Sequence, residues 1–190
     1  MQIDVTRWLS LVTRDAVASA TATVGTTGPD GSVQHLSEHR LAAPGLLRWS
    51  YTVWDADGEV HRRCDGRHLM QVSGDGEQLS SPVPEEDSRD DPRYFYSWPA
   101  VVDAWLVELL RPVDLLSRVV VSAVTEPDAT GLVHIDASPL GNEPSPYHGF
   151  ALPDRRTLRI VLDPERGCLV AVTVSRVDRP PLTCRLTELV

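Results

Sequence analysis

The second half of the chain, residues 111–188, holds five β-strand candidates in succession, each bounded by proline, glycine or aspartate. The candidates cover residues 118–125, 132–138, 157–163, 168–176 and 181–189. Turn-forming segments separate the last three of them, Asp163-Pro164-Glu165-Arg166-Gly167 and Val177-Asp178-Arg179-Pro180. Such short segments connect antiparallel neighbours, so this half predicts an antiparallel sheet.

The first half predicts a meander of further antiparallel strands. Residues 46–55 alternate strictly, with Leu47, Trp49, Tyr51 and Val53 on one face and Arg48, Ser50, Thr52 and Trp54 on the other. Strand candidates also cover residues 21–27, 32–41, 59–64 and 67–73. Tight turns such as Gly28-Pro29-Asp30-Gly31 and Asp55-Ala56-Asp57-Gly58 connect them. The whole chain therefore predicts about ten strands.

Two amphipathic helices accompany these strands. The first, over residues 5–20, is apolar at Val5, Trp8, Leu9, Val12, Ala16 and Val17. The second, over residues 101–110, is apolar at Val101, Val102, Trp105, Leu106, Leu109 and Leu110, and a short helical turn follows over 113–116. Residues 80–93 are acidic and proline-rich and predict a surface loop, whereas residues 139–154 form a long Pro/Gly loop typical of lids or binding loops.

Together these patterns predict one α+β domain spanning residues 1–190. Its single curved antiparallel sheet forms a half-open β-barrel, and the N-terminal and central helices cover or plug the concave face.

Composition and charge narrow the range of functions. The net charge is −9, which argues against binding nucleic acid, because phosphates require a basic face. All 18 basic residues are arginine, so lysine chemistry such as Schiff-base formation is excluded. No window reaches the ~18 apolar residues of a membrane span. The N-terminus lacks a basic region followed by an apolar run, which predicts a cytoplasmic protein as written, and an extracytoplasmic one if a signal segment was removed.

The three cysteines, Cys64, Cys168 and Cys184, have no metal-ligand spacing and are expected to be small buried residues. A Cys168–Cys184 disulfide is geometrically feasible, because the two lie in consecutive strand candidates, but it is not the favoured interpretation.

The order of elements resembles the LolA-like lipoprotein-carrier superfamily, with its RseB-type and mycobacterial lipid-binding relatives. The residues that carry the resemblance are LLRWSYTVWDADGEVHRRCDGRHLMQV, LLRPVDLLS, GLVHIDASP and the closing LRIVLDPERGCLVAVTVSRVDRPPLTCRLTELV. The resemblance implies a half-barrel whose concave apolar face, partly covered by helices, accepts a lipid or another lipophilic molecule. These relatives work outside the cytoplasm, so the absence of a signal peptide is a departure from the pattern.

The residues expected to contact such a ligand are large and apolar: Trp49, Tyr51, Trp54, Trp98, Trp105 and Leu109. Aromatic rings on a sheet and on its covering helix are able to line a pocket that buries most of an apolar ligand. For each of these residues, plain core packing is the alternative.

Candidates for acid–base chemistry are His134 and Asp136, which share a strand face, and His148 in the long loop. His134 and Asp136 would enter a pocket only if the apolar face of their strand pointed away from it. His35 and His39 share a face with Ser37 but lie roughly 13 Å apart, too far for one metal ion. We therefore predict no metal site, and the lack of a phosphate-binding or dinucleotide-binding glycine loop predicts no cofactor.

Three functional hypotheses remain open. In the first, the chain binds a lipophilic small molecule, such as an acyl chain or an apolar metabolite. In the second, it is an enzyme that cyclises or hydrolyses a lipophilic intermediate of secondary metabolism in the same cavity. In the third, it is a regulator that binds a protein partner. The first is slightly favoured, because no tight catalytic constellation is visible in the sequence.

Overall fold

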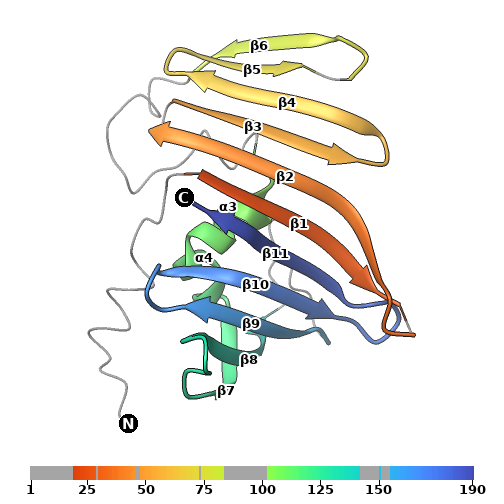
Figure 1. Ribbon diagram of the computed structural model, residues 1–190, viewed down its shortest axis with the longest axis vertical. Helices are drawn as coiled ribbons and strands as arrows, with labels where there is room; N and C mark the ends of the chain where they lie inside the picture. Colours follow the sequence, from red (N-terminus) through yellow and green to blue (C-terminus); the bar gives the residue numbers. More distant parts are fainter. Residues whose placement is uncertain are drawn as a thin grey trace.

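A computed structural model describes residues 19–28, 30–45, 48–72, 74–83, 102–141, 150 and 155–190. It contains one antiparallel sheet of eleven strands in the order β6-β5-β4-β3-β2-β1-β11-β10-β9-β8-β7 (Figure 1). The strands are β1 (Ser19–Thr27), β2 (Val33–Gly45), β3 (Arg48–Asp55), β4 (Gly58–Asp65), β5 (His68–Val72), β6 (Gln78–Pro82), β7 (Val119–Val124), β8 (Val133–Pro139), β9 (Thr157–Asp163), β10 (Cys168–Ser175) and β11 (Leu182–Leu189). β1 pairs with β11, so the two predicted meanders join into a single sheet.

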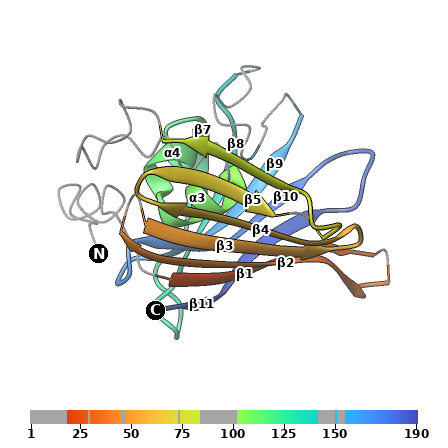
Figure 2. The same cartoon turned by 90° about the horizontal axis from the view of Figure 1, so that it is seen from above.

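The sheet is strongly curved but not closed, which confirms the predicted half-open barrel. Figure 2 shows the strands bending around the two short helices. The pairing register shifts within β1, β2, β7 and β10, and such bulges bend a strand and increase its twist. β6 and β7 remain as the two edges of the described sheet.

Two consecutive helices, α3 (Ala104–Leu110) and α4 (Pro112–Leu116), lie against the concave face, as predicted for the central helix. Pro112 ends α3, since it has no N–H for that helix, and it begins α4 at a position where none is needed. The predicted helix over residues 5–20 falls almost wholly outside the described residues. We call the face of the sheet that carries α3 and α4 the inner face, and the opposite face the outer face.

The core consists of two apolar clusters on the inner face. One cluster packs β7–β11 against Leu109 and Leu115, and its sheet residues include Ile135, Ile160 and Val172. The other packs β1–β4 against α3 and comprises Ala20, Ala22, Leu41, Ala43, Trp49, Tyr51, Val53, Cys64, Val102, Leu106, Val107 and Leu110. Trp105 contacts both clusters, so α3 holds the two halves of the sheet together.

A buried carboxylate lies among these apolar residues. Glu108 of α3 is 1 % exposed, and its Oε1 lies 2.7 Å from Nη2 of Arg118. The Phe150 N–H donates to its Oε2 at 3.2 Å. Burial raises the pKa of Glu108, while the Arg118 guanidinium acts in the opposite direction. The guanidinium thus compensates for placing a carboxylate in the core.

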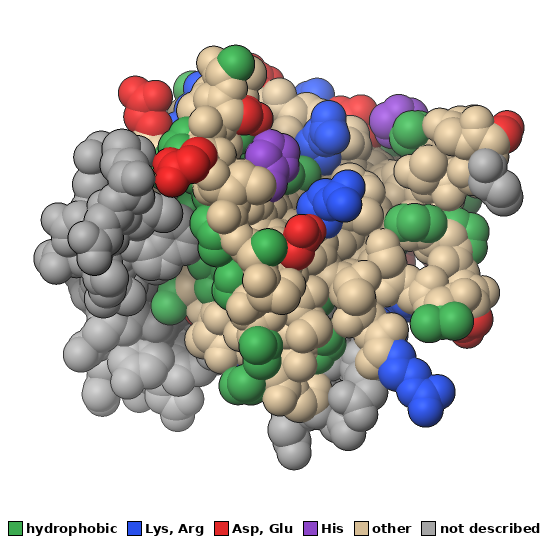
Figure 3. Space-filling view, turned by 90° about the horizontal axis from the view of Figure 1, so that it is seen from below, with side chains coloured by type: hydrophobic (Ala, Val, Ile, Leu, Met, Phe, Trp, Pro, Cys, Tyr) green, Lys and Arg blue, Asp and Glu red, His purple; other side chains and the backbone are tan. Residues whose placement is uncertain are grey.

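β6 was not predicted, since the acidic, proline-rich residues from 80 onward indicated a surface loop. Every residue of β6 is exposed, so no apolar alternation marks it. Its backbone pairs with β5, from His68 opposite Pro82 to Val72 opposite Gln78. At the other edge, Val120, Val121 and Val124 of β7 are 45–48 % exposed. Viewed toward that edge, hydrophobic side chains form small separate areas among charged and polar ones (Figure 3).

Candidate functional site

The inner face of β3 holds two of the aromatic residues expected to bind a ligand. Trp49 is 4 % exposed and Tyr51 is fully buried, and both point toward the apolar cluster beneath α3. Leu109 is also fully buried, but it belongs to the cluster on β7–β11, and Trp105 is half-buried between the two clusters. The structure thus brings these four residues together around one helix.

Trp54, another of the expected ligand-binding residues, lies on the outer face of β3. The guanidinium carbon of Arg40 lies 5.3 Å from the centre of its ring, a cation–π arrangement. Its side chain therefore does not share a surface with Trp49 or Tyr51. Trp98 and His148 fall outside the described residues.

Trp49 has an unusual hydrogen-bonding state. Its indole Nε1 is buried and has no hydrogen-bond partner among the residues that the structure describes. Buried donors are nearly always paired, and leaving one unpaired costs about 1–3 kcal/mol. Trp49 pairs across strands with Cys64 of β4, and the partly buried Leu69 and Val83 pack against the same cluster. An apolar surface with one unsatisfied donor is suited to a mainly apolar molecule that carries an acceptor oxygen.

A chain of polar groups crosses the same inner face at the other end of β2 and β3. Nε2 of His39 lies 2.7 Å from Oγ of Ser37, and Nδ1 lies 2.7 Å from the hydroxyl of Tyr51. Nδ1 is also 3.4 Å from a carboxylate oxygen of Asp103. His39 is 2 % exposed, so the imidazole at the centre of these contacts is shielded from bulk water.

Asp103 reaches this chain instead of capping the helix that follows it. It occupies the N-cap position of α3, yet its side chain makes no capping hydrogen bond. Its second oxygen lies 3.6 Å from Arg62, whose guanidinium carbon lies 5.8 Å from the centre of the Tyr51 ring. The Trp105 ring meets His39 edge-on at 4.7 Å. His39 is thus held between the sheet and the start of the helix.

Burial governs protonation in this cluster. It lowers the pKa of His39 below 6.5, and although the Asp103 carboxylate acts in the opposite direction, the imidazole is neutral at pH 7. Burial, followed by the charge of Asp103, raises the pKa of Tyr51, so its hydroxyl keeps its proton.

His39 and Ser37 were predicted only as part of a possible metal site, and Asp103 was not among the predicted site residues. The spacing of Ser37 and His39 on one strand was visible, and it is the signal that would have found the pair. The contribution of Asp103 was hidden, because an aspartate before a helix is usually read as a cap.

The acid–base candidates His134 and Asp136 lie on the outer face of β8, since Val133 and Ile135 are buried in the core. Nε2 of His134 lies 3.1 Å from Asp128, and Asp136 lies 3.6 Å from Nε of Arg159. Both pairs are exposed. Each residue therefore has its own ion-pair partner on the face that does not carry the helices.

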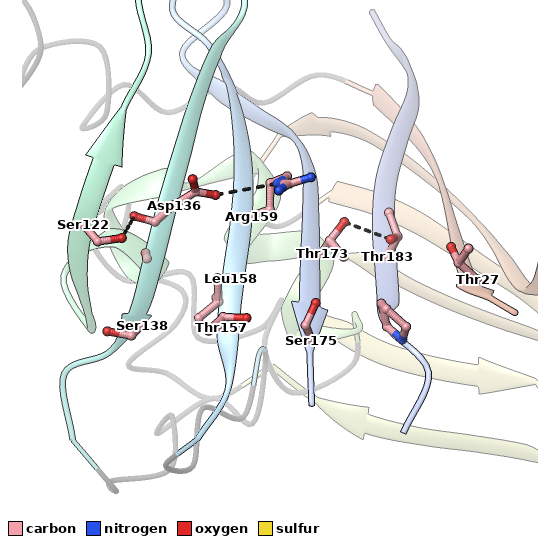
Figure 4. A pocket seen from close by; sticks show the side chains of 12 residues that line it. Thr27, Ser122, Asp136, Ser138, Thr157, Leu158, Arg159, Thr173, Ser175 and Thr183 are labelled. Carbon is pink, nitrogen blue, oxygen red and sulfur yellow. Dashed lines mark hydrogen bonds and ion pairs between the residues drawn. The ribbon is translucent and has the colours of Figure 1, made fainter. Parts of the chain in front are cut away.

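A groove of about 620 Å³ runs over this part of the outer face (Figure 4). Hydroxyl groups dominate its lining, and the hydroxyls of Thr173 and Thr183 lie 2.9 Å apart. Asp136 and Arg159 cross its upper part, and Ser122 donates to the backbone oxygen of Asp136. Such a polar lining is unsuited to a lipophilic molecule.

The described residues contain no group of three His, Cys, Asp or Glu side chains arranged to hold a metal ion. The three cysteines are buried and none of them forms a disulfide within the described residues. Cys168 lies opposite Asp163, and Cys184 lies opposite Val172. Within the part of the chain that is described, no helix is long and apolar enough to cross a membrane.

No protein-family model matches the chain, and no curated protein matches it. Among solved structures, it is similar to MucB, with a TM-score of 0.38 and 14 % identity over 98 % of this chain and 58 % of MucB. MucB in complex with MucA(peri) gives a TM-score of 0.35 and 15 % identity, over 97 % of this chain and 54 % of that one. LprF from Mycobacterium bovis gives 0.40 and 9 % identity, over 97 % and 93 %.

The chain thus spans little more than half the length of MucB. Because all three TM-scores are below 0.5, we base the functional proposals on the residues of this chain.

Proposed function

We propose that the protein binds a lipophilic small molecule, such as an acyl chain or an apolar metabolite, on the inner face of β3–β5 beside α3. The observation that carries this proposal is the buried Nε1–H of Trp49, which lies within an apolar cluster and has no partner in the described part of the chain. The ligand would place an acceptor oxygen at this donor and its apolar part against Leu69, Val83 and their neighbours. Burial of apolar surface, at ~25 cal/mol per Å², would drive the binding.

The polarity of the two faces supports this choice. On the inner face, the cluster around Trp49 is built from apolar side chains. The groove on the outer face is lined mainly by hydroxyls and an exposed ion pair, which are well hydrated without a ligand. A lipophilic molecule therefore gains more from contact with the inner face.

The test is a titration of the full chain with a fluorescent fatty acid, together with mass spectrometry of the organic extract of the purified protein. Trp49→Phe keeps an aromatic ring but removes the donor, and it should weaken binding roughly 2- to 10-fold, the value of one net hydrogen bond. Trp54→Phe is the matched control on the outer face, and its affinity should equal that of the wild type.

Equal affinities for Trp49→Phe and the wild type would show that the Nε1–H does not contact the ligand. A folded wild-type chain that shows no saturable binding and yields no apolar compound on extraction would overturn the proposal as a whole.

A further inference from the structure

We propose that Ser37 is an activated nucleophile and that His39 is its general base, so that the chain transfers or hydrolyses apolar acyl groups. The proposal rests on the hydrogen bonds of His39 to Ser37 and Tyr51 and on its contact with Asp103, which a binding function leaves without a role. It is independent of the ligand proposed for the cluster around Trp49.

The position of the imidazole proton of His39 follows from its contact with Asp103. Nδ1 of His39 lies 3.4 Å from a carboxylate oxygen of Asp103, and a carboxylate only accepts hydrogen bonds. The neutral imidazole therefore carries its proton on Nδ1, and the Tyr51 oxygen at 2.7 Å accepts from it. With its proton on Nδ1, the imidazole has a lone pair on Nε2, and the Ser37 hydroxyl donates to that lone pair at 2.7 Å.

This arrangement meets the requirements of an activated serine. The nucleophile lies within hydrogen-bond distance of a neutral base, and a second group fixes the tautomer of that base. Tyr51 and Asp103 act as positioning residues, because they hold the proton on Nδ1 and would stabilise the imidazolium that forms during the reaction. Asp55, Glu38 and Arg62 are the other charged groups that influence His39.

The surroundings of Ser37 indicate the class of substrate. Ser37 is half-buried, so its hydroxyl is reachable, while His39 behind it is shielded from water. Its cross-strand neighbour in β1 is Val24, and His39 lies opposite Val53 of β3. Both valines are buried, which favours an ester or thioester with an apolar acyl group over a charged one.

The reaction balances without a cofactor. Nε2 of His39 takes the Ser37 proton as Oγ bonds to the carbonyl carbon of the substrate. The bond from that carbon to the leaving oxygen or sulfur then breaks, and the leaving group takes the proton from Nε2. Water, deprotonated by the same nitrogen, attacks the acyl-serine ester, releases the carboxylic acid and restores the Ser37 hydroxyl.

The experiment uses the full chain and p-nitrophenyl octanoate. We expect release of p-nitrophenolate and, after rapid acid quenching, one octanoyl group on the peptide that contains Ser37. Ser37→Ala should lower the rate by about 100-fold or more, the usual contribution of such a nucleophile–base pair. Ser50→Ala, an exposed serine of β3 outside this network, should leave the rate unchanged.

Two further variants distinguish chemistry from folding. Ser37→Cys should be acylated more readily than a free thiol, because His39 stabilises the thiolate. In Tyr51→Phe the tautomer of His39 is less well fixed, so the rate should fall and the acid limb of the pH–rate profile should shift. Thermal stability is measured in parallel for this variant. Equal rates for the wild type and a folded Ser37→Ala, an octanoyl group on a different residue, or no acylation of Ser37→Cys would each overturn the proposal.

Discussion

Replacing Arg118 with methionine should destabilise the protein strongly, because it leaves the Glu108 carboxylate buried without its cation. The two side chains are in contact at 2.7 Å, and they are 1 % and 20 % exposed. Removing one partner of a buried pair costs about 3–5 kcal/mol. In a chain of this size, this loss corresponds to a decrease in Tm of roughly 6–20 °C.

The loss should depend on pH in a definite direction. The pKa of Glu108 is raised above its ordinary value of 4.5, so the folded state binds this proton more tightly than the unfolded state. The stability that a raised pKa contributes is fully present at a pH below the pKa of the unfolded state. It is lost as the pH rises through the pKa of the folded state. In Arg118→Met the guanidinium no longer opposes the shift, so the folded pKa rises further and the variant regains stability at acidic pH.

Urea unfolding at pH 5 and pH 8 measures both effects. The difference between the wild type and Arg118→Met should be larger at pH 8, by about 1.4 kcal/mol for each unit of additional pKa shift within that range. The double variant Glu108→Gln/Arg118→Met removes both charges of this pair. It should therefore be more stable than the single variant at pH 8 and show no such difference between the two pH values. A loss for Arg118→Met that is the same at both pH values, or that the second substitution does not relieve, would refute the reasoning.

Two further predictions concern the core. Ile160→Ala should lower the free energy of unfolding by about 2–5 kcal/mol, because removing most of this fully buried side chain leaves a cavity. Val161→Ala, on the opposite face of β9, should lower it less in the same urea experiment. Equal losses for the two variants would contradict the assignment of the inner face. Burial raises the pKa of Cys168 to about 11 and that of Cys184 to about 12, so iodoacetamide at pH 8 should alkylate both slowly in the folded protein. All three cysteines should react in denaturant without reductant, whereas two unreactive thiols would indicate a disulfide.

The architecture was predictable because its signals are local. Turn residues and strict alternation marked the hairpins, and the buried side chains Trp49, Tyr51 and Val53 lie on one face of β3, as the alternation indicated. β6 was missed, because an edge strand with only exposed side chains is defined by backbone pairing, which leaves no pattern in its residues.

The candidate site was predictable only in part, because it depends on contacts between distant segments. Alternation placed Trp49 on the inner face, but it did not reveal that the indole N–H would lack a partner. Nor did it show that Asp103 would turn from its helix toward Tyr51 and His39, which lie on two neighbouring strands. Such choices are decided by tertiary packing, which outweighs the local preference of an aspartate for capping.

The two proposed sites share a face of the sheet, yet their chemistry and position separate them. Ser37 lies four residues before Leu41 on β2, and Leu41 pairs with Tyr51 of β3. Trp49 lies two residues before Tyr51, which in this antiparallel pair is two residues farther from Ser37. At ~3.3 Å per residue, the serine and the indole are roughly 20 Å apart along the strands. Substituting Ser37 therefore leaves the apolar cluster around Trp49 intact, and Trp49→Phe leaves the contacts of His39 with Ser37, Tyr51 and Asp103 intact. Each site is therefore tested by a variant that does not alter the other. Fatty-acid binding that survives loss of acyl transfer would identify a carrier. Acyl transfer without stable binding would identify an enzyme that releases its product.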